Sequence, residues 1–281
     1  MKAKIAHGLM PLVALCALAV QALAQGQDRQ PLQPSSKWVV DYADSECRLT
    51  RTFGTGDDQV TLRLARGASL TFYDVVLAGP GLPELPPQLA VDFSLEPSGQ
   101  RSKIEQAYSM MVPGQSFRFV RWYDSAAAAF AGWTDQQRVT VTLSDSAKIS
   151  MQAEDGKKAL AALATCHDDL LSGWKVDVAA LRELGSLPEP RGNPALWILS
   201  DDYPSKPLRN GETGITRVHL EVGTDGRATD CRVIGSSGNT ILDDRSCKLL
   251  LKRARFAPAK RKDGTAALAP YFRTIRWQIP D

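Results

Sequence analysis

Hydrophobic and polar residues alternate with a period of two in three stretches near the end of the chain. These stretches run from Ile215 to Val222, from Ala228 to Ile234 and from Tyr271 to Ile279. The period predicts three strands, each with one buried side and one side that faces solvent. Between the first two, Asp225-Gly226 suits the tight turn of a hairpin, because glycine readily adopts positive φ.

A helical pattern lies between the second and third of these strands. Asp243 or Asp244 is expected to cap its first turn, because a short side-chain oxygen accepts from the free amide groups there. Pro258 is expected to stop the helix. The order predicts a β-β-α-β arrangement, in which one helix lies across a small sheet. The apolar stripe of the helix comprises Leu242, Leu249, Leu250, Ala254 and Phe256.

The region from Trp38 to Trp174 is predicted to be rich in strands and to end in a helix. Period-two alternation marks strands at 59–64, 116–122 and 138–143. From Gly156 onward the apolar residues recur at helical spacing instead. The expected fold class is therefore α+β, with a larger β-rich domain before the C-terminal β-β-α-β domain. The apolar face of this first helix comprises Leu160, Leu163, Cys166, Leu170 and Leu171.

The first residues have the pattern of a secretory leader. Lys2 and Lys4 precede an apolar stretch from Leu9 to Val20, and Ala22-Leu23-Ala24 follows. This pattern predicts a cleavable signal peptide at 1–24 and a periplasmic protein. The apolar stretch of about 12 residues is shorter than the roughly 20 that a membrane-spanning helix needs. An uncleaved inner-membrane anchor is the alternative.

The balance of charge changes along the chain. After the leader and up to Pro190, 16 Lys and Arg stand against 21 Asp and Glu, whereas from Arg191 onward the numbers are 16 and 10. Prolines and a glycine between these parts are typical of a linker, so we expect two domains. The expected segments are a short extended stretch at 25–37, a β-rich accessory domain at 38–186, a Pro/Gly linker at 187–194 and a C-terminal domain at 195–281.

Removal of the leader would leave four cysteines, Cys47, Cys166, Cys231 and Cys247. An even number in an exported chain indicates disulfides, and four cysteines allow three pairings. The domain division favours Cys47 with Cys166 and Cys231 with Cys247. Buried free thiols are the alternative to these bridges.

The sequence has little to offer an enzyme. His167 and His219 are the histidines that follow the leader, and His219 is expected at the surface because it lies on the polar side of its strand. We find no C-x-x-C pair and no phosphate-binding glycine motif, so no metal, cofactor or small-molecule substrate is predicted. Nucleic acid is not an expected partner of an exported protein.

The order of these signals resembles the TonB C-terminal domain of Gram-negative bacteria. The resemblance covers 195–281 and rests on Tyr203-Pro204, Gly214 with its strand, Asp225-Gly226, Ser236-Ser237-Gly238, Leu242-Asp243, the run from Arg255 to Ala259, and Asp263-Gly264. It implies a module that binds proteins and catalyses no reaction. In this family an extended peptide of an outer-membrane transporter adds to an edge strand. The partner-binding residues that it implies are Tyr203, Pro204, Tyr271, Arg273, Thr274 and Ile275.

The chain also departs from this family. A TonB energy transducer keeps a membrane anchor and a long proline-rich spacer, whereas here a leader and a further acidic domain precede the C-terminal part. We therefore expect a periplasmic adaptor of the cell envelope, with an anchored transducer as the first alternative. An envelope enzyme with its site in the 38–186 domain is the second. Basic residues between Arg245 and Lys262 suit either the solvent face of the helix or an anionic envelope component.

Overall fold

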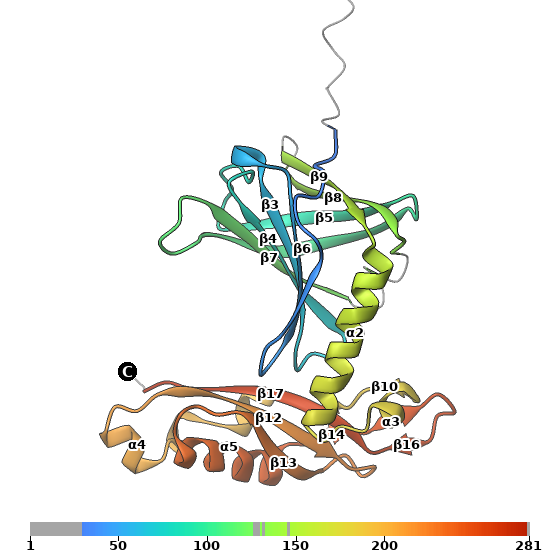
Figure 1. Ribbon diagram of the computed structural model, residues 1–281. Coiled ribbons are helices and arrows are strands. Elements are labelled where there is room, and N and C mark those ends of the chain that lie inside the picture. The colour runs from blue at the N-terminus through green and yellow to red at the C-terminus, as the bar shows by residue number, and fades with distance from the viewer. Residues whose placement is uncertain (1–29, 126–129, 131–132, 145–146, 280–281) are drawn as a thin grey trace, which may run out of the picture. The chain divides into compact units, whose positions relative to one another are not determined.

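The computed structural model describes residues 30–125, 130, 133–144 and 147–279. The predicted leader at 1–24 lies outside the described residues. The fold is α+β and contains more strand than helix. Most of the strands belong to one large curled sheet, which precedes a small three-stranded sheet in the chain (Figure 1).

The large sheet has nine strands, and each strand is antiparallel to its neighbours. Its strands alternate between buried and more accessible residues, as the sequence pattern predicts. One short 3-10 turn, Gly56–Asp58, joins two of them. In spatial order the strands are β1 (Val39–Tyr42), β2 (Cys47–Phe53), β3 (Val60–Arg66), β4 (Phe72–Gly79), β7 (Arg118–Ser125), β6 (Gln100–Met111), β5 (Gln88–Glu96), β8 (Gln136–Ser144) and β9 (Ala147–Glu154).

The short stretch before β1 bridges β9, at one end of this sheet, and β2, the strand next to the other end. The Leu32 amide donates to the Ser150 carbonyl in β9, and the Ser35 amide donates to the Thr52 carbonyl in β2, at 2.8 and 2.9 Å. Part of the stretch predicted as extended at 25–37 is therefore held by backbone hydrogen bonds. These bonds satisfy donors and acceptors at the sheet ends and help to keep the sheet curled.

The buried side of the curled sheet holds the first hydrophobic core. Trp122, Phe53 and Phe93 are among its largest fully buried side chains. The helix α2 (Gly156–Gly173) adds its apolar face to this core. A disulfide between Cys47 and Cys166, with 6.0 Å between the Cα atoms, joins α2 to β2.

The segment after α2 is ordered by short elements that pair with the end of the chain. Two residues of the stretch predicted as a linker, Glu189 and Pro190, form β11 and pair with β14. The preceding β10 pairs with β15, which also pairs with β16. The bounds are α3 (Val178–Arg182), β10 (Leu184–Ser186), β11 (Glu189–Pro190), β14 (Phe256–Ala257), β15 (Ala259–Arg261) and β16 (Ala266–Ala267).

The C-terminal part is built on the sheet β13-β12-β17, in which β12 lies in the middle. The helix α5 packs on β12 and β13, and between them lies the second hydrophobic core (Figure 1). The disulfide Cys231–Cys247 joins β13 to α5. The bounds are 3-10 turns at Pro194–Trp197 and Ser200–Asp202, α4 (Ser205–Arg209), β12 (Gly214–Val222), β13 (Ala228–Gly235), α5 (Thr240–Arg253) and β17 (Ala269–Trp277).

The bounds of α5 differ from the sequence-based expectation. Asn239 caps the helix, because its side-chain oxygen accepts from the amides of Ile241 and Leu242. Asp243, one of the two expected caps, lies one turn inside the helix and is buried. The helix ends at Arg253, before Pro258, because the next residues turn away to form β14 and β15.

Candidate partner-binding edge

The strand β17 has a neighbour on one side. It pairs with β12 along its whole length, from Gly214 opposite Trp277 to Val222 opposite Ala269. No other strand among the described residues pairs with β17. The backbone donors and acceptors on its other side are therefore not paired with any strand among the described residues. Residues 270–274 line a cavity of about 440 Å³ together with residues 68–72 and 187–188.

The hydrogen-bond pattern indicates which residues of β17 point to this free side. Gly223 donates its amide to the Arg227 carbonyl on the β13 side, so Val222 points its backbone groups toward β17. Val222 lies opposite Ala269, and the pairing continues without a bulge. Alternate residues of β17 then face outward. These are Pro270, Phe272, Thr274 and Arg276. An outward position suits Pro270, because proline has no amide hydrogen to donate to β12.

Two of the predicted partner-binding residues belong to the core. Ile275 is 6% exposed, and Tyr203 is 9% exposed. The Tyr203 hydroxyl donates to the Glu212 carbonyl, and its ring packs edge-on against Trp277, 5.3 Å between centroids. Pro204 is half-buried and precedes α4. These side chains stabilise the fold around the edge and offer little surface to a partner.

The remaining three predicted residues lie on β17 itself. Tyr271 is half-buried against Phe256, with 4.7 Å between ring centroids. Arg273 is half-buried, and Thr274 is exposed. The sequence-based list omits Phe272 and Arg276, although the alternation of the strand could have shown that they share a side with Thr274.

His219 is buried, contrary to the expectation of a surface residue. It is 3% exposed and stacks on Phe272, with 5.2 Å between ring centroids. The Trp174 ring in turn lies against Phe272, with 5.6 Å between ring centroids. Burial, together with the charge of Arg232, lowers the pKa of His219 below its usual value. Trp174 is distant from Phe272 in the sequence, so no local pattern signals this contact.

A buried carboxylate removes two cations from the basic stretch between Arg245 and Lys262. Asp202 is 6% exposed and forms ion pairs with Arg253 and with Arg245, the latter at 3.3 Å. The hydrogen bond from Arg253 is the main cause that lowers the Asp202 pKa, and burial opposes it. These pairs attach the 3-10 turn at 200–202 to α5, and they reduce the charge that is open to an anionic partner.

A second buried carboxylate connects α5 to the sheet. Asp243 accepts from the Thr216 hydroxyl at 2.8 Å, the Ser236 hydroxyl at 2.5 Å and the Ser237 amide at 2.9 Å. Burial raises its pKa, but the hydrogen bonds from Ser236, Ser237 and Thr216 outweigh burial, and the net shift is downward. Asp243 therefore fixes the start of α5 against β12 and the loop after β13.

The described residues contain no cluster of three or more His, Cys, Asp or Glu side chains placed to hold a metal ion. Within the same residues, none of the helices has the length and apolar character needed to cross a membrane.

Comparison with known families found a match in the C-terminal part of the chain. Residues 200–279 match the family model described as Gram-negative bacterial TonB protein C-terminal. This match confirms the resemblance. No curated protein and no solved structure matches the chain significantly. The segment 200–279, which we call the TonB-type segment, is similar to this family, whose domains are non-enzymatic and envelope-associated and generally interact with outer-membrane transporters.

Proposed function

We propose that the TonB-type segment binds an extended peptide of an envelope protein by adding it as a strand to β17. The observation that carries this proposal is the unpaired side of β17, with the outward amides of Phe272, Thr274 and Arg276. Main-chain hydrogen bonds along such an edge provide affinity, and the neighbouring side chains provide selectivity. The proposed partner is a periplasmic peptide of an outer-membrane transporter, and the segment catalyses no reaction.

A substitution of Thr274 by proline tests the strand addition. Proline would delete an outward-facing amide hydrogen and place a ring at the edge. Thr274→Ala keeps the amide and is the matched control, because Thr274 is exposed and its side chain packs little. Binding of synthetic transporter peptides would be measured by calorimetry. We expect binding to be lost in Thr274→Pro and kept in Thr274→Ala; binding by a folded proline variant would contradict the proposal.

We further propose that the mature protein is released into the periplasm and starts at Gln25. Mass spectrometry of the protein from its native envelope tests this. The expected mass is that of a chain that starts at Gln25, and it rises by the mass of four hydrogens on reduction because two disulfides open. A full-length mass in the membrane fraction would identify an anchored transducer instead.

We propose that the chain before the TonB-type segment folds as a separate accessory domain. The support is the presence of two cores: one draws on residues between Leu32 and Leu170, and the other on residues between Trp197 and Trp277. Because β10 and β11 pair with β15 and β14, a C-terminal fragment should begin before Leu184 to keep these pairs. Aggregation of both the C-terminal fragment and its complement would contradict the division.

A further inference from the structure

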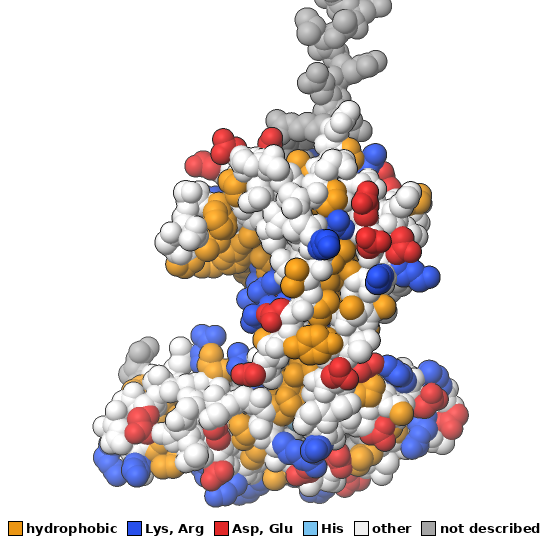
Figure 2. Space-filling model, viewed as in Figure 1, with side chains coloured by type: hydrophobic (Ala, Val, Ile, Leu, Met, Phe, Trp, Pro, Cys, Tyr) orange, Lys and Arg blue, Asp and Glu red, His pale blue; other side chains and the backbone are white. Residues whose placement is uncertain are grey.

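Three large apolar side chains are exposed at the end of the hairpin formed by β6 and β7. Tyr108, Met110 and Met111 are 44%, 58% and 46% exposed. We call residues 108–119 the hairpin tip. Figure 2 shows hydrophobic side chains gathered at this hairpin, at the left of the upper part of the view. Methionine is flexible and polarisable, so such side chains suit a soft or irregular partner.

The hairpin tip extends past its neighbour on one side. The strand β5 begins at Gln88, which lies opposite Tyr108, so β6 has no partner on that side from Met110 onward among the described residues. The turn is closed by its own backbone, because the Val112 amide donates to the Phe117 carbonyl at 3.0 Å. A turn with internal hydrogen bonds can enter an apolar medium at lower cost than an open loop.

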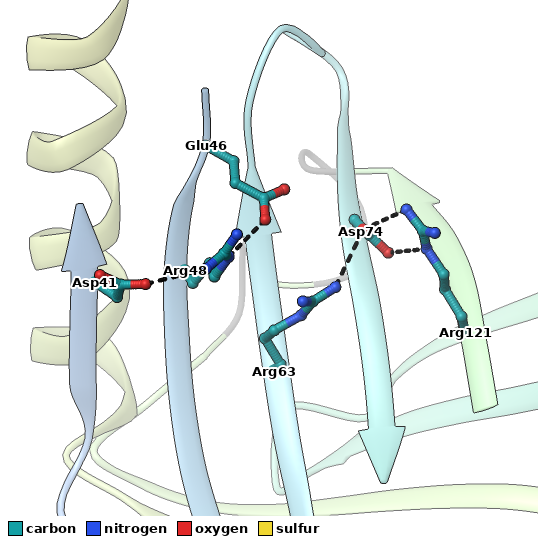
Figure 3. Close-up of polar contacts among 6 residues, drawn as sticks. All are labelled: Asp41, Glu46, Arg48, Arg63, Asp74 and Arg121. Atoms are coloured by element: carbon teal, nitrogen blue, oxygen red, sulfur yellow. Dashed lines mark hydrogen bonds and ion pairs between the residues drawn. The ribbon is translucent and has the colours of Figure 1, made fainter. Parts of the chain in front are cut away.

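The hairpin tip carries positive charge and no negative charge. Between 108 and 119 the sequence contains Arg118 and no acidic residue. The next arginine, Arg121, is held by Asp74 through two hydrogen bonds of 2.8 and 2.7 Å, and Arg63 approaches the same carboxylate at 3.4 Å (Figure 3). Arg118 has no ion pair among the described residues. The tip therefore combines exposed apolar side chains with one cation that is not neutralised.

We propose that the hairpin tip inserts into the headgroup region of a phospholipid bilayer. Tyr108 has the amphipathic ring that prefers the membrane interface, and Arg118 can pair with a lipid phosphate. The absence of acidic residues fits an anionic lipid surface. Three side chains are too few for a stable protein interface of roughly 1,000 Å² or more, but they suffice for shallow insertion. This inference does not depend on strand addition at β17.

Vesicle binding by the full mature chain tests the proposal. Co-sedimentation would use vesicles of phosphatidylcholine alone and vesicles with added phosphatidylglycerol. Met110→Ser combined with Met111→Ser should lower the partition coefficient at least about tenfold on both vesicles, since two methionines lose apolar burial. Arg118→Gln should lower it about fivefold on the anionic vesicles alone. Leu196→Ser is the matched control: Leu196 is 61% exposed and lies outside the tip.

A second readout keeps the test independent of these substitutions. Ser116 is exposed in the turn, so a cysteine introduced there can carry an environment-sensitive fluorophore. Addition of vesicles should shift its emission to shorter wavelengths. An unshifted emission, or equal vesicle binding by the double serine variant, would overturn the proposal. A wild-type dimer in solution that the double serine variant abolishes, without vesicle binding, would assign the tip to a second copy and also overturn it.

Discussion

Replacement of Asp243 by alanine is the sharpest test of how the C-terminal core is held together. The carboxylate is 6% exposed and accepts three hydrogen bonds, and one of the donors, the Thr216 hydroxyl, is fully buried. Hydrogen bonds to a charged group contribute about 1.5–3 kcal/mol each, and a buried donor without a partner costs about 1–3 kcal/mol. Water can reach Ser236, which is exposed, and Ser237, which is half-buried, so we expect a loss of about 3 kcal/mol.

Urea unfolding of the full chain, with the disulfides intact, measures this loss. Asp244→Ala is the matched control, because the adjacent carboxylate is exposed. Its free energy of unfolding should change by no more than about 0.5 kcal/mol. A loss below about 1 kcal/mol in Asp243→Ala, or an equal loss in the control, would refute the assignment of Asp243 as a stabilising centre.

The pH dependence of stability is an independent test of the role of Asp243. The pKa of Asp243 in the folded chain lies below its ordinary value of 3.8. Its contribution to stability is therefore fully present above that value and is lost as the pH falls through the folded pKa. The stability difference between the wild type and Asp243→Asn should shrink correspondingly below about pH 4. A difference that stays constant down to pH 2 would contradict the lowered pKa.

Three further tests probe other parts of the fold. Burial lowers the pKa of His167 from 6.5 to about 4, so the unfolded chain takes up a proton at a higher pH than the folded chain does. The free energy of unfolding should therefore fall by about 3 kcal/mol between pH 7 and pH 4. Urea titrations of His167→Gln should lack this pH dependence. Replacement of Cys231 and Cys247 by serine should cost about 3 kcal/mol in the same assay, and unchanged melting under reducing conditions would contradict it. Gly226→Ala, at φ +77°, would place a Cβ 2.1 Å from the Phe256 carbonyl oxygen. Gly238→Ala, at φ +86°, would place its Cβ where no atom lies within 4 Å. Gly226→Ala should therefore lower the melting temperature clearly more than Gly238→Ala.

Local patterns in the sequence identified the strands β3, β7, β8, β12, β13 and β17, and they favoured the cysteine pairing that the structure shows. Alternation shows which side of a strand is buried, and helical spacing shows which side of a helix is, because both periods follow from backbone geometry. Cys47 lies on the buried side of β2, and Cys166 lies on the buried face of α2. Their pairing could therefore be inferred without knowledge of the strand order.

The strand order itself could not be inferred. Besides β3, the neighbour of β4 is β7, so that Val75 lies opposite Trp122, and β5 and β6 are placed on the far side of β7. Many strands in this sheet have similar alternation, and nothing in one strand's pattern selects a partner 47 positions away. The burial of His219 is likewise not evident from its own strand, since His219 stacks on Phe272 of β17, and Trp174 from outside the TonB-type segment packs on Phe272.

The burial of Tyr203 and Ile275 also changes where selectivity at β17 should originate. Because those side chains lie in the core, the candidates for selecting a partner are the residues of β17 whose backbone faces outward, which are Pro270, Phe272, Thr274 and Arg276. Of these, Arg276 carries a charge. It is exposed and has no carboxylate within ion-pair distance among the described residues. A peptide with an acidic side chain opposite Arg276 should bind more tightly, by up to about 1 kcal/mol for an exposed pair.

Charge reversal at this position separates selectivity from strand addition. Arg276→Glu should reverse the preference between matched acidic and basic peptides, while the backbone donor at Thr274 keeps the overall affinity. Calorimetry with both peptides, at low and at high salt, measures the effect, and high salt should reduce it. If Arg276→Glu left the preference unchanged while Thr274→Pro still abolished binding, the edge would bind through its main chain alone. Selectivity would then have to come from the half-buried Tyr271 and Arg273.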